Sequence, residues 1–369
     1  MSNLDEEISV ARKEIVSDGY DMSIGEVMNL YRDEELIIDP EFQRYFRWNA
    51  SQKTKFIESL LLGIPIPPIF VFQTKKGLWE LIDGLQRLST VFEFAGMLRG
   101  PDGQIMEPSI IEGTKMLPSL AGKRWEDSDQ LTTDGIGKTQ QLQIKRARLR
   151  VEILKMESDP HAKFELFQRI NTGGSQLSEQ EVRNCTAIML NRQFHQWLLD
   201  AANNADFNST IVATENSLKK QYNVELALRF FAFRNVPYQN GLDVHEYLDG
   251  ALIEMAAGKV GNLTAEKDIF NRTFRLLNQA LGEDVFKRWD GTRFLGMFLL
   301  SVFEVVTTGV SKNLDSIGAM SPPDQMNFVK TKTKELWTDP VFQRNSGAGI
   351  RGTTRLANLL PMAERFFRP

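Results

Sequence analysis

The stretch IDGLQRL, residues 82–88, lies where an apolar run ends and a helix-forming segment, residues 88–97, begins. Gly84 allows the backbone to approach a ligand closely. The first N–H groups of a helix have no intrahelical partners and lie at the positive end of the helix dipole. Arg87, one turn into this helix, can form two parallel hydrogen bonds to an anion. The stretch therefore predicts a strand, a corner and a helix start that bind phosphate, with Asp83 holding a metal ion or positioning a water molecule.

A purely structural interpretation fits the same residues. Asp83 as the N-cap, with Gln86 three residues later, is a capping pair. A cap does not need Arg87, and because Val91 occupies the position four residues further on, we expect no local salt bridge for this arginine. The two interpretations are compatible, since a capped helix start can still bind an anion.

The composition is that of an ordinary globular protein. The chain has 369 residues, of which 42% are hydrophobic and 25% charged, and this length favours two domains. The net charge of −4 does not favour nucleic-acid binding by the whole chain, but it allows a local basic face. The single cysteine, Cys185, excludes an internal disulfide and a cysteine-rich zinc site. No apolar run reaches the ~18 residues of a membrane helix, so we expect a cytoplasmic protein that does not enter the membrane.

Residues 41–48 interleave aromatic and basic side chains. They are compatible with a hydrophobic plug whose arginines are solvated. They are equally compatible with a polar pair, Gln43 and Arg44, that reaches into a binding site.

A second polar loop is expected after a helix that begins at Asp159-Pro160. The pair Gly173-Gly174 is a routine helix stop. Asn171 and Thr172 add short polar groups that a stop does not require. The loop is therefore either a simple helix terminus or a place where these two side chains contact a ligand.

Residues 146–153 alternate between two kinds of side chain, which predicts a half-buried strand. One face is basic and the other is apolar. The basic face is either an exposed surface neutralised by nearby acids or a DNA-binding patch. Its arginines are Arg146, Arg148 and Arg150, which alternate with Ala147, Leu149, Val151 and Ile153.

Periodicity elsewhere in the first half predicts a helix over residues 51–62 and a β-hairpin over residues 69–82. Residues 99–140 are rich in Gly, Pro and Asp and predict long loops. We therefore expect a mixed α/β core in residues 1–185.

The second half has a different pattern. From about residue 183 the periodicity is helical almost throughout, and it includes a predicted helix over residues 292–307. Residues 344–355 carry three arginines in a sequence typical of a mobile loop. Residues 186–369 are therefore expected to form a mostly α-helical region, which makes the whole chain an α+β protein.

Four motifs follow one another along the first half: Gln43-Arg44 with Trp48, then Ile64-Pro65-Ile66-Pro67, then residues 82–87, then Asn171-Thr172-Gly173-Gly174 before Leu177-Ser178. Together they resemble the N-terminal domain of GmrS/GmrD-type modification-dependent (type IV) restriction systems, within the ParB/sulfiredoxin-like superfamily. The resemblance covers about residues 35–185.

This resemblance implies a small ParB/sulfiredoxin-like mixed α/β core that binds and hydrolyses a nucleoside triphosphate with Mg²⁺ or another divalent cation. The family signature is Asp-Gly-Gln-Gln-Arg, and Leu85 replaces its first glutamine, which puts the contribution of that position in doubt. The implied catalytic residues are Asp83, Gln86 and Arg87, with Asp83 as the metal ligand, and the implied nucleotide-binding residues are Gly84, Gln43, Arg44, Asn171 and Thr172.

Systems of this family normally contain an HNH nuclease domain, and the three histidines of this chain are too scattered to form one. The resemblance therefore implies a nucleotide-hydrolysing sensor or regulatory subunit of a prokaryotic anti-phage defence system. Its expected partners are a nucleotide, DNA and a separate nuclease or other defence subunit, and a homo-oligomer is compatible with it. One alternative is a non-enzymatic ParB-like DNA-binding module with nucleotide as a switch. The other is a scaffold in which residues 83–87 only cap a helix.

Overall fold

The computed structural model describes residue 4 and residues 17–38, 48–100, 102–129, 131–155, 179–212 and 221–369. The chain forms two compact units, residues 1–175 and 176–369. The boundary expected at residue 185 falls inside helix α8 (Glu179–Leu190), which lies wholly in the second unit. None of the described helices is long and apolar enough to cross a membrane. A mixed α/β unit followed by a helical one confirms the expected α+β fold.

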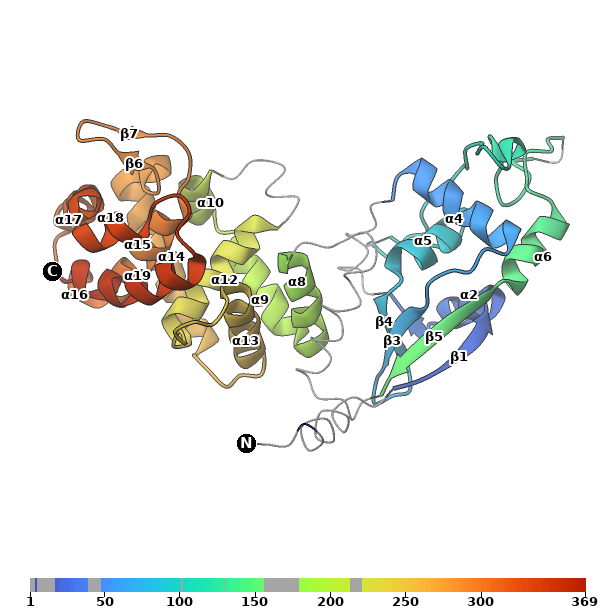
Figure 1. The fold of residues 1–369 in the computed structure, drawn as a ribbon, viewed down its shortest axis with the longest axis horizontal. Coiled ribbons are helices and arrows are strands. Elements are labelled where there is room, and N and C mark those ends of the chain that lie inside the picture. The colour runs from blue at the N-terminus through green and yellow to red at the C-terminus, as the bar shows by residue number, and fades with distance from the viewer. Residues whose placement is uncertain are drawn as a thin grey trace. The chain divides into compact units, whose positions relative to one another are not determined.

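Five strands form a mixed sheet in the first unit (Figure 1). They are β1 (Ser17–Ser23), β2 (Leu36–Ile37), β3 (Ile69–Gln73), β4 (Trp79–Asp83) and β5 (Arg148–Leu154). Their order is β1-β5-β3-β4-β2. The pairs β1–β5 and β3–β4 are antiparallel, while β3–β5 and β2–β4 are parallel. The predicted β-hairpin is therefore confirmed as β3 and β4.

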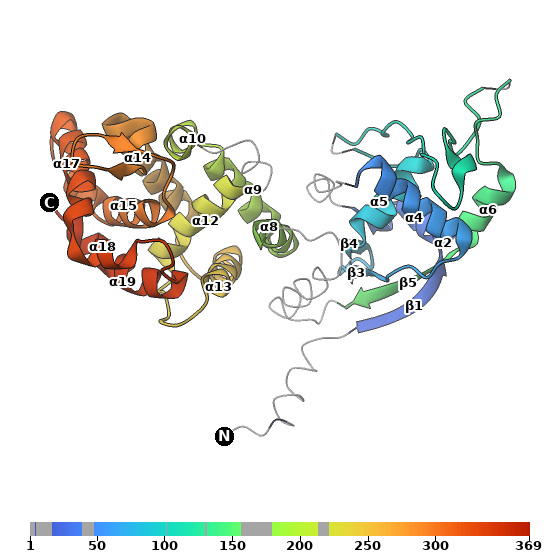
Figure 2. The same ribbon diagram turned by 45° about the horizontal axis from the view of Figure 1, so that its top comes forward.

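Four helices lie together on one side of this sheet (Figure 2). They are α2 (Ile24–Arg32), α4 (Ala50–Leu62), α5 (Leu85–Phe94) and α6 (Lys138–Arg146). The predicted helix over residues 51–62 is confirmed as α4, which starts at a capping box between Asn49 and Gln52 and ends at Gly63 with a left-handed φ of 67°. Tyr31 stacks on Phe92 with ring centroids 4.2 Å apart, which joins α2 to α5 in the core.

The basic strand differs from its prediction at its beginning. Arg146 is the last residue of α6 and not part of the strand. The N–H of Ala147 still bonds to the carbonyl groups of Gln143 and Ile144, as in a helix. The extended backbone of β5 therefore begins only at Arg148. From there the predicted alternation holds, with Leu149 and Val151 buried. The loops predicted before α6 are confirmed, since the described residues there form just one short 3₁₀ turn, η1 (Pro118–Leu120), and two isolated β-bridges.

The second unit is helical, as predicted, and buried phenylalanines dominate its core, among them Phe230, Phe270 and Phe303. Its helices after α8 are α9 (Arg192–Ala202), α10 (Ala205–Ile211), α12 (Tyr222–Asn235), α13 (Val244–Ala256), α14 (Leu263–Leu281), α15 (Leu300–Lys312), α16 (Leu314–Gly318), α17 (Pro322–Glu335), α18 (Pro340–Asn345) and α19 (Gly352–Phe366), with 3₁₀ turns η2 (Gly282–Asp284) and η3 (Leu336–Thr338).

A small hairpin stands where the sequence predicted the start of a helix. Strands β6 (Arg288–Trp289) and β7 (Phe294–Leu295) pair antiparallel, and α15 begins only at Leu300. The Asp290 carboxylate accepts hydrogen bonds from the N–H groups of Thr292 and Arg293 at 2.7 and 2.8 Å. These bonds hold a turn and lower the pKa of Asp290 to about 2. The apolar residues after this turn therefore begin in a strand and not in a helix.

Candidate functional site

Asp83 ends strand β4 at an irregularity of the sheet. Phe70 pairs with Asp83 but Val71 pairs with Leu81, so the register shifts and Ile82 is an extra residue. Leu81 and Ile82 are both buried. A bulge of this kind bends the strand and re-aims the next side chain. The Asp83 side chain consequently stays 30% exposed at the end of the strand.

Gly84 forms the corner between β4 and α5. Its φ is 106°, a conformation that glycine adopts without strain. A Cβ atom here would collide with Cγ2 of Ile69 and lie 2.9 Å from its Cβ. The glycine is therefore required by packing against β3 as well as by its backbone angle.

No side-chain hydrogen bond caps α5 in the described part of the chain, and its N-cap residue is Gly84. The predicted capping pair of Asp83 and Gln86 is therefore wrong. The side-chain oxygen of Gln86 instead accepts a hydrogen bond from the N–H of Trp48 at 3.0 Å. Gln86 thus fixes the chain just before α4, while the start of α5 keeps its positive dipole end without a capping carboxylate.

Arg87 turns back over this corner. Its Nη2 atom donates to Oδ2 of Asp83 at 2.6 Å and to the carbonyl of Pro68 at 2.9 Å. The expectation that Arg87 has no local salt bridge is therefore wrong, because its partner lies four residues before it and not four residues after it. Its Nε is buried and has no hydrogen-bond partner among the described residues. We call residues 83–87 in this arrangement the Asp83–Arg87 corner.

The other predicted nucleotide-binding residues cannot be placed beside this corner. Gln43, Arg44, Asn171 and Thr172 lie outside the described residues. The described part of the chain also contains no group of three or more His, Cys, Asp or Glu side chains able to hold a metal ion. Among the described residues of the corner, Asp83 is the carboxylate that could ligate a cation, and Mg²⁺ commonly takes one or two protein carboxylates together with phosphate and water.

The three predicted DNA-binding arginines have different surroundings. Arg150 bonds through Nε to Glu152 at 2.8 Å and lies 4.0 Å from Asp21. Arg146 and Arg148 have no ion pair or side-chain hydrogen bond within the described chain. The acids that neutralise the strand thus act on Arg150 and leave the other two guanidinium groups available.

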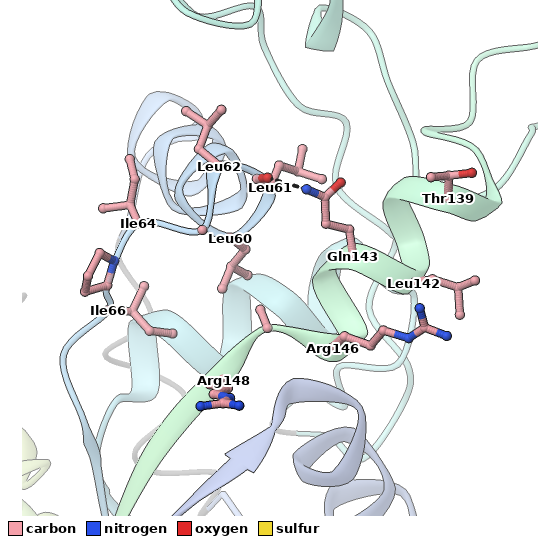
Figure 3. Close-up of a pocket in the computed structure, with 13 residues that line it drawn as sticks. Leu60, Leu61, Leu62, Ile64, Ile66, Thr139, Leu142, Gln143, Arg146 and Arg148 are labelled. Carbon is pink, nitrogen blue, oxygen red and sulfur yellow. Dashed lines mark hydrogen bonds between the residues drawn. The ribbon is translucent and has the colours of Figure 1, made fainter.

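Arg146 and Arg148 line a hollow of about 710 Å³ between the end of α4 and α6. Figure 3 shows both arginines across this hollow from the exposed side chains of Leu62 and Ile64. The side chain of Gln143 donates to the carbonyl of Leu61 at 2.7 Å and closes one end. Sequence reasoning did not identify this hollow, although the run Ile64-Pro65-Ile66 on its wall belongs to the motifs that carry the family resemblance.

A family model matches most of the first unit and the beginning of the second. The family described as GmrSD restriction endonuclease, N-terminal domain, matches residues 24–188. No curated protein sequence matches the chain. Two solved structures of a pNOB8-like ParB N-domain align with it at 12% and 13% identity, covering 90% and 93% of this chain and 96% and 95% of those chains, with TM-scores of 0.27 and 0.28. TM-scores of this size do not establish a shared fold. On the family match, residues 24–188, which contain the Asp83–Arg87 corner, form a GmrSD-type restriction endonuclease N-terminal domain.

Proposed function

We propose that the first unit binds a nucleoside triphosphate at the Asp83–Arg87 corner and hydrolyses it with a divalent cation. The observation that carries this proposal is the buried Nε of Arg87, which has no partner in the described chain and lies next to a helix start that no side chain caps. A buried donor without an acceptor costs about 1–3 kcal/mol. A phosphate oxygen at this position would satisfy it and would also lie at the positive end of α5.

Each residue of the corner has a role in this proposal. Arg87 would hold a phosphate oxygen, and its bonds to Asp83 and Pro68 fix the guanidinium in advance. Asp83 would share its carboxylate between Arg87 and the cation. A cation held there would supply charge neutralisation for the phosphates. Hydrolysis would add water to the terminal phosphorus and break the phosphoanhydride bond, and it would release a nucleoside diphosphate, inorganic phosphate and a proton. Gly84 would let the phosphate approach the backbone, and Gln86 would keep α4 and α5 in register through Trp48.

Calorimetric titration with nucleoside triphosphates and Mg²⁺, followed by turnover measurement, tests this proposal. The variant is Arg87→Ala and the matched control is Arg124→Ala. Arg124 also forms an arginine–aspartate pair, with Asp134 at 3.3 Å, on a loop of the same unit. We expect the first variant to lose binding and the control to bind like the wild type. Binding that survives in Arg87→Ala would place the nucleotide elsewhere.

The family match also bears on the cellular role. We propose that the protein is a sensor or regulatory subunit of a modification-dependent restriction system and acts with DNA and a separate nuclease. The family name supports a restriction role for the domain. Purification of the protein with the products of its neighbouring genes, with and without nucleoside triphosphate, would identify a nuclease partner. A nuclease that associates equally with the wild type and with Arg87→Ala would argue against nucleotide-dependent regulation.

One observation favours a second candidate, a DNA-binding module in which nucleotide serves as a switch. Arg146 and Arg148 have no ion pair within the described part of the chain and lie beside one hollow, and guanidinium groups suit phosphate backbones. Turnover of nucleoside triphosphate measured with and without DNA separates the candidates. A sensor enzyme hydrolyses the nucleotide, and its turnover responds to DNA. A switch module binds both nucleotide and DNA but does not hydrolyse the nucleotide.

A further inference from the structure

A second hollow lies in the helical unit, outside the residues that match the family. Its volume is about 640 Å³, and it is bounded by the first turns of α13 and α19. Its wall carries three arginines, one histidine and one aspartate, together with four uncharged residues. The charged and imidazole side chains are Arg229, Arg351, Arg355, His245 and Asp243, and the other lining residues are Gly241, Val244, Gly352 and Thr353. We call it the α13–α19 hollow.

The two helix starts are packed closely at this hollow. A Cβ atom on Gly352 would lie 2.7 Å from Cγ2 of Val244, so a larger residue here would require Val244 to move. Asp243 caps α13 by accepting a hydrogen bond from the N–H of His245 at 2.8 Å. No side chain caps α19 in the described chain. One of two adjacent positive helix ends therefore has its own carboxylate and the other has none.

The side chains on the wall offer hydrogen-bond donors that nothing in the described chain uses. The Arg351 guanidinium is exposed and has no hydrogen bond or ion pair there. Arg355 bonds to Glu304 through Nε at 2.7 Å and Nη2 at 3.2 Å, which leaves its Nη1 group unused. Glu304 is fully buried and so holds Arg355 in a fixed orientation. The sequence prediction of a mobile loop over residues 344–355 is wrong at both ends, because Arg344 belongs to α18 and Arg355 to α19.

His245 adds another donor. The buried Arg183 donates from Nη2 to Nδ1 of His245, 2.9 Å away, because a guanidinium cannot accept a hydrogen bond. The proton of the neutral imidazole is therefore on Nε2, which has no partner in the described chain. Asp243 is the acidic side chain on this wall, and it is already engaged as the cap of α13. The hollow thus presents more donors than acceptors to a ligand.

We propose that the α13–α19 hollow binds a small phosphate-bearing molecule. Arg351, Arg355 and Nε2 of His245 would surround the phosphate at the uncapped start of α19. Tetrahedral oxyanions accept hydrogen bonds in several directions, as this arrangement of donors requires. The volume exceeds what one phosphate group fills, so the rest of the ligand has room beside the phosphate. This site is independent of the Asp83–Arg87 corner.

Pyrophosphate and adenosine monophosphate, titrated calorimetrically into the full chain, test the proposal and distinguish an inorganic from an organic phosphate ligand. The titrations use the Arg87→Ala background, so that binding at the other site does not contribute. Arg351→Ala should weaken the affinity for at least one probe by about ten- to a hundredfold, as for loss of a charged hydrogen bond. This variant should fold normally because Arg351 is exposed and has no ion pair or hydrogen bond in the described chain.

The matched control is Arg344→Ala, an exposed arginine of the same unit that does not line the hollow. It should bind both probes like the parent. Equal weakening by the two variants would show nonspecific attraction and overturn the site. Failure of both probes to bind would also overturn the site. Binding of duplex DNA at these arginines without binding of either small probe would overturn it too.

Discussion

Arg87 and Asp83 form an ion pair of 2.6 Å across a left-handed glycine, and the same Arg87 nitrogen bonds to the carbonyl of Pro68. The pair therefore ties the end of β4 and the start of α5 to the segment that leads into β3. The Arg87 side chain is only 15% exposed. The arginine that suits a phosphate is thus also a structural link.

Replacement of Arg87 should affect both binding and stability. We expect Arg87→Lys to weaken nucleotide binding nearly as much as Arg87→Ala, by about ten- to a hundredfold, because a lysine cannot reproduce a planar pair of donors. Both variants should also lower the free energy of unfolding of the first unit by about 1–3 kcal/mol, since the Pro68 carbonyl and Asp83 lose their partner. Calorimetric titration and denaturant unfolding measure the two effects. A lysine variant that binds like the wild type would mean that Arg87 supplies only charge.

Asp83 should be needed for hydrolysis more than for nucleotide binding. Asp83→Asn keeps the size of the side chain and removes its charge, so we expect turnover to be lost while the fold survives. Because one negative charge near the phosphates disappears, affinity measured without Mg²⁺ should stay the same or rise. Affinity measured with Mg²⁺ should fall. Titrations with and without the cation give this comparison, and unchanged turnover in the variant would remove Asp83 from the catalytic group.

Gly84→Ala tests the corner as a packing element. The new Cβ collides with Ile69 and adopts a strained φ, and we expect a loss of stability of about 1–3 kcal/mol or more. Ile69→Ala removes part of the obstacle. The double variant should therefore lose less stability than the sum of the two single variants, and the difference between them is the coupling energy. Additive losses would show that the backbone angle alone requires glycine.

Local rules predicted much of the first unit. The capping residues of helix α4 and its terminating Gly63 are close to the helix in sequence, and the two strands of the β3–β4 hairpin are also close to each other in sequence. The strand, corner and helix around Gly84 were predicted for the same reason. The partner of Arg87 was missed because Asp83 precedes the helix, and only the left-handed turn at Gly84 brings it within reach.

Contacts between distant residues could not be predicted in this way. Strand β1 is largely polar, and only its pairing with β5 identifies it. In the second unit Arg355 reaches Glu304 across 51 residues, and Arg183 reaches Asp249 across 66. A single sequence, read without homologues, contains no signal for such pairs. The α13–α19 hollow, whose Arg355 and His245 are held by Glu304 and Arg183, was therefore not predicted either.

The basic arginines should differ in their effect on DNA binding, if the first unit binds DNA. Each phosphate contact contributes about 0.9 to the slope of log affinity against log salt concentration. Arg146→Ala with Arg148→Ala should lower the magnitude of that slope by up to about 1.8, because neither guanidinium group has an ion pair among the residues that the structure describes. Arg150→Ala is the control and should change it little, since Glu152 already holds that side chain. An unchanged slope in the double variant would make these arginines part of an ordinary solvated surface.

Glu225 should make the second unit sensitive to acid. Burial alone would raise the pKa of this carboxyl, but Arg229 and Arg183 outweigh burial and hold its pKa below the ordinary value of 4.5. The folded state therefore binds this proton less readily than the unfolded state does. The resulting stabilisation is complete above the unfolded pKa and is lost as the pH falls through the lower folded pKa. We expect protection of α12 amides from hydrogen exchange to decline as the pH falls below about 4.5.

Glu225→Gln should flatten this pH dependence because it removes the titrating group. The variant should also be less stable at neutral pH by about 3 kcal/mol, since Arg229 loses a partner at 2.7 Å inside the protein. The control is Glu246→Gln, an exposed residue of α13 with no ion pair in the described chain. It should leave the exchange profile of α12 unchanged. If Glu225→Gln kept the acid dependence of the wild type, Glu225 would not be the group responsible for it.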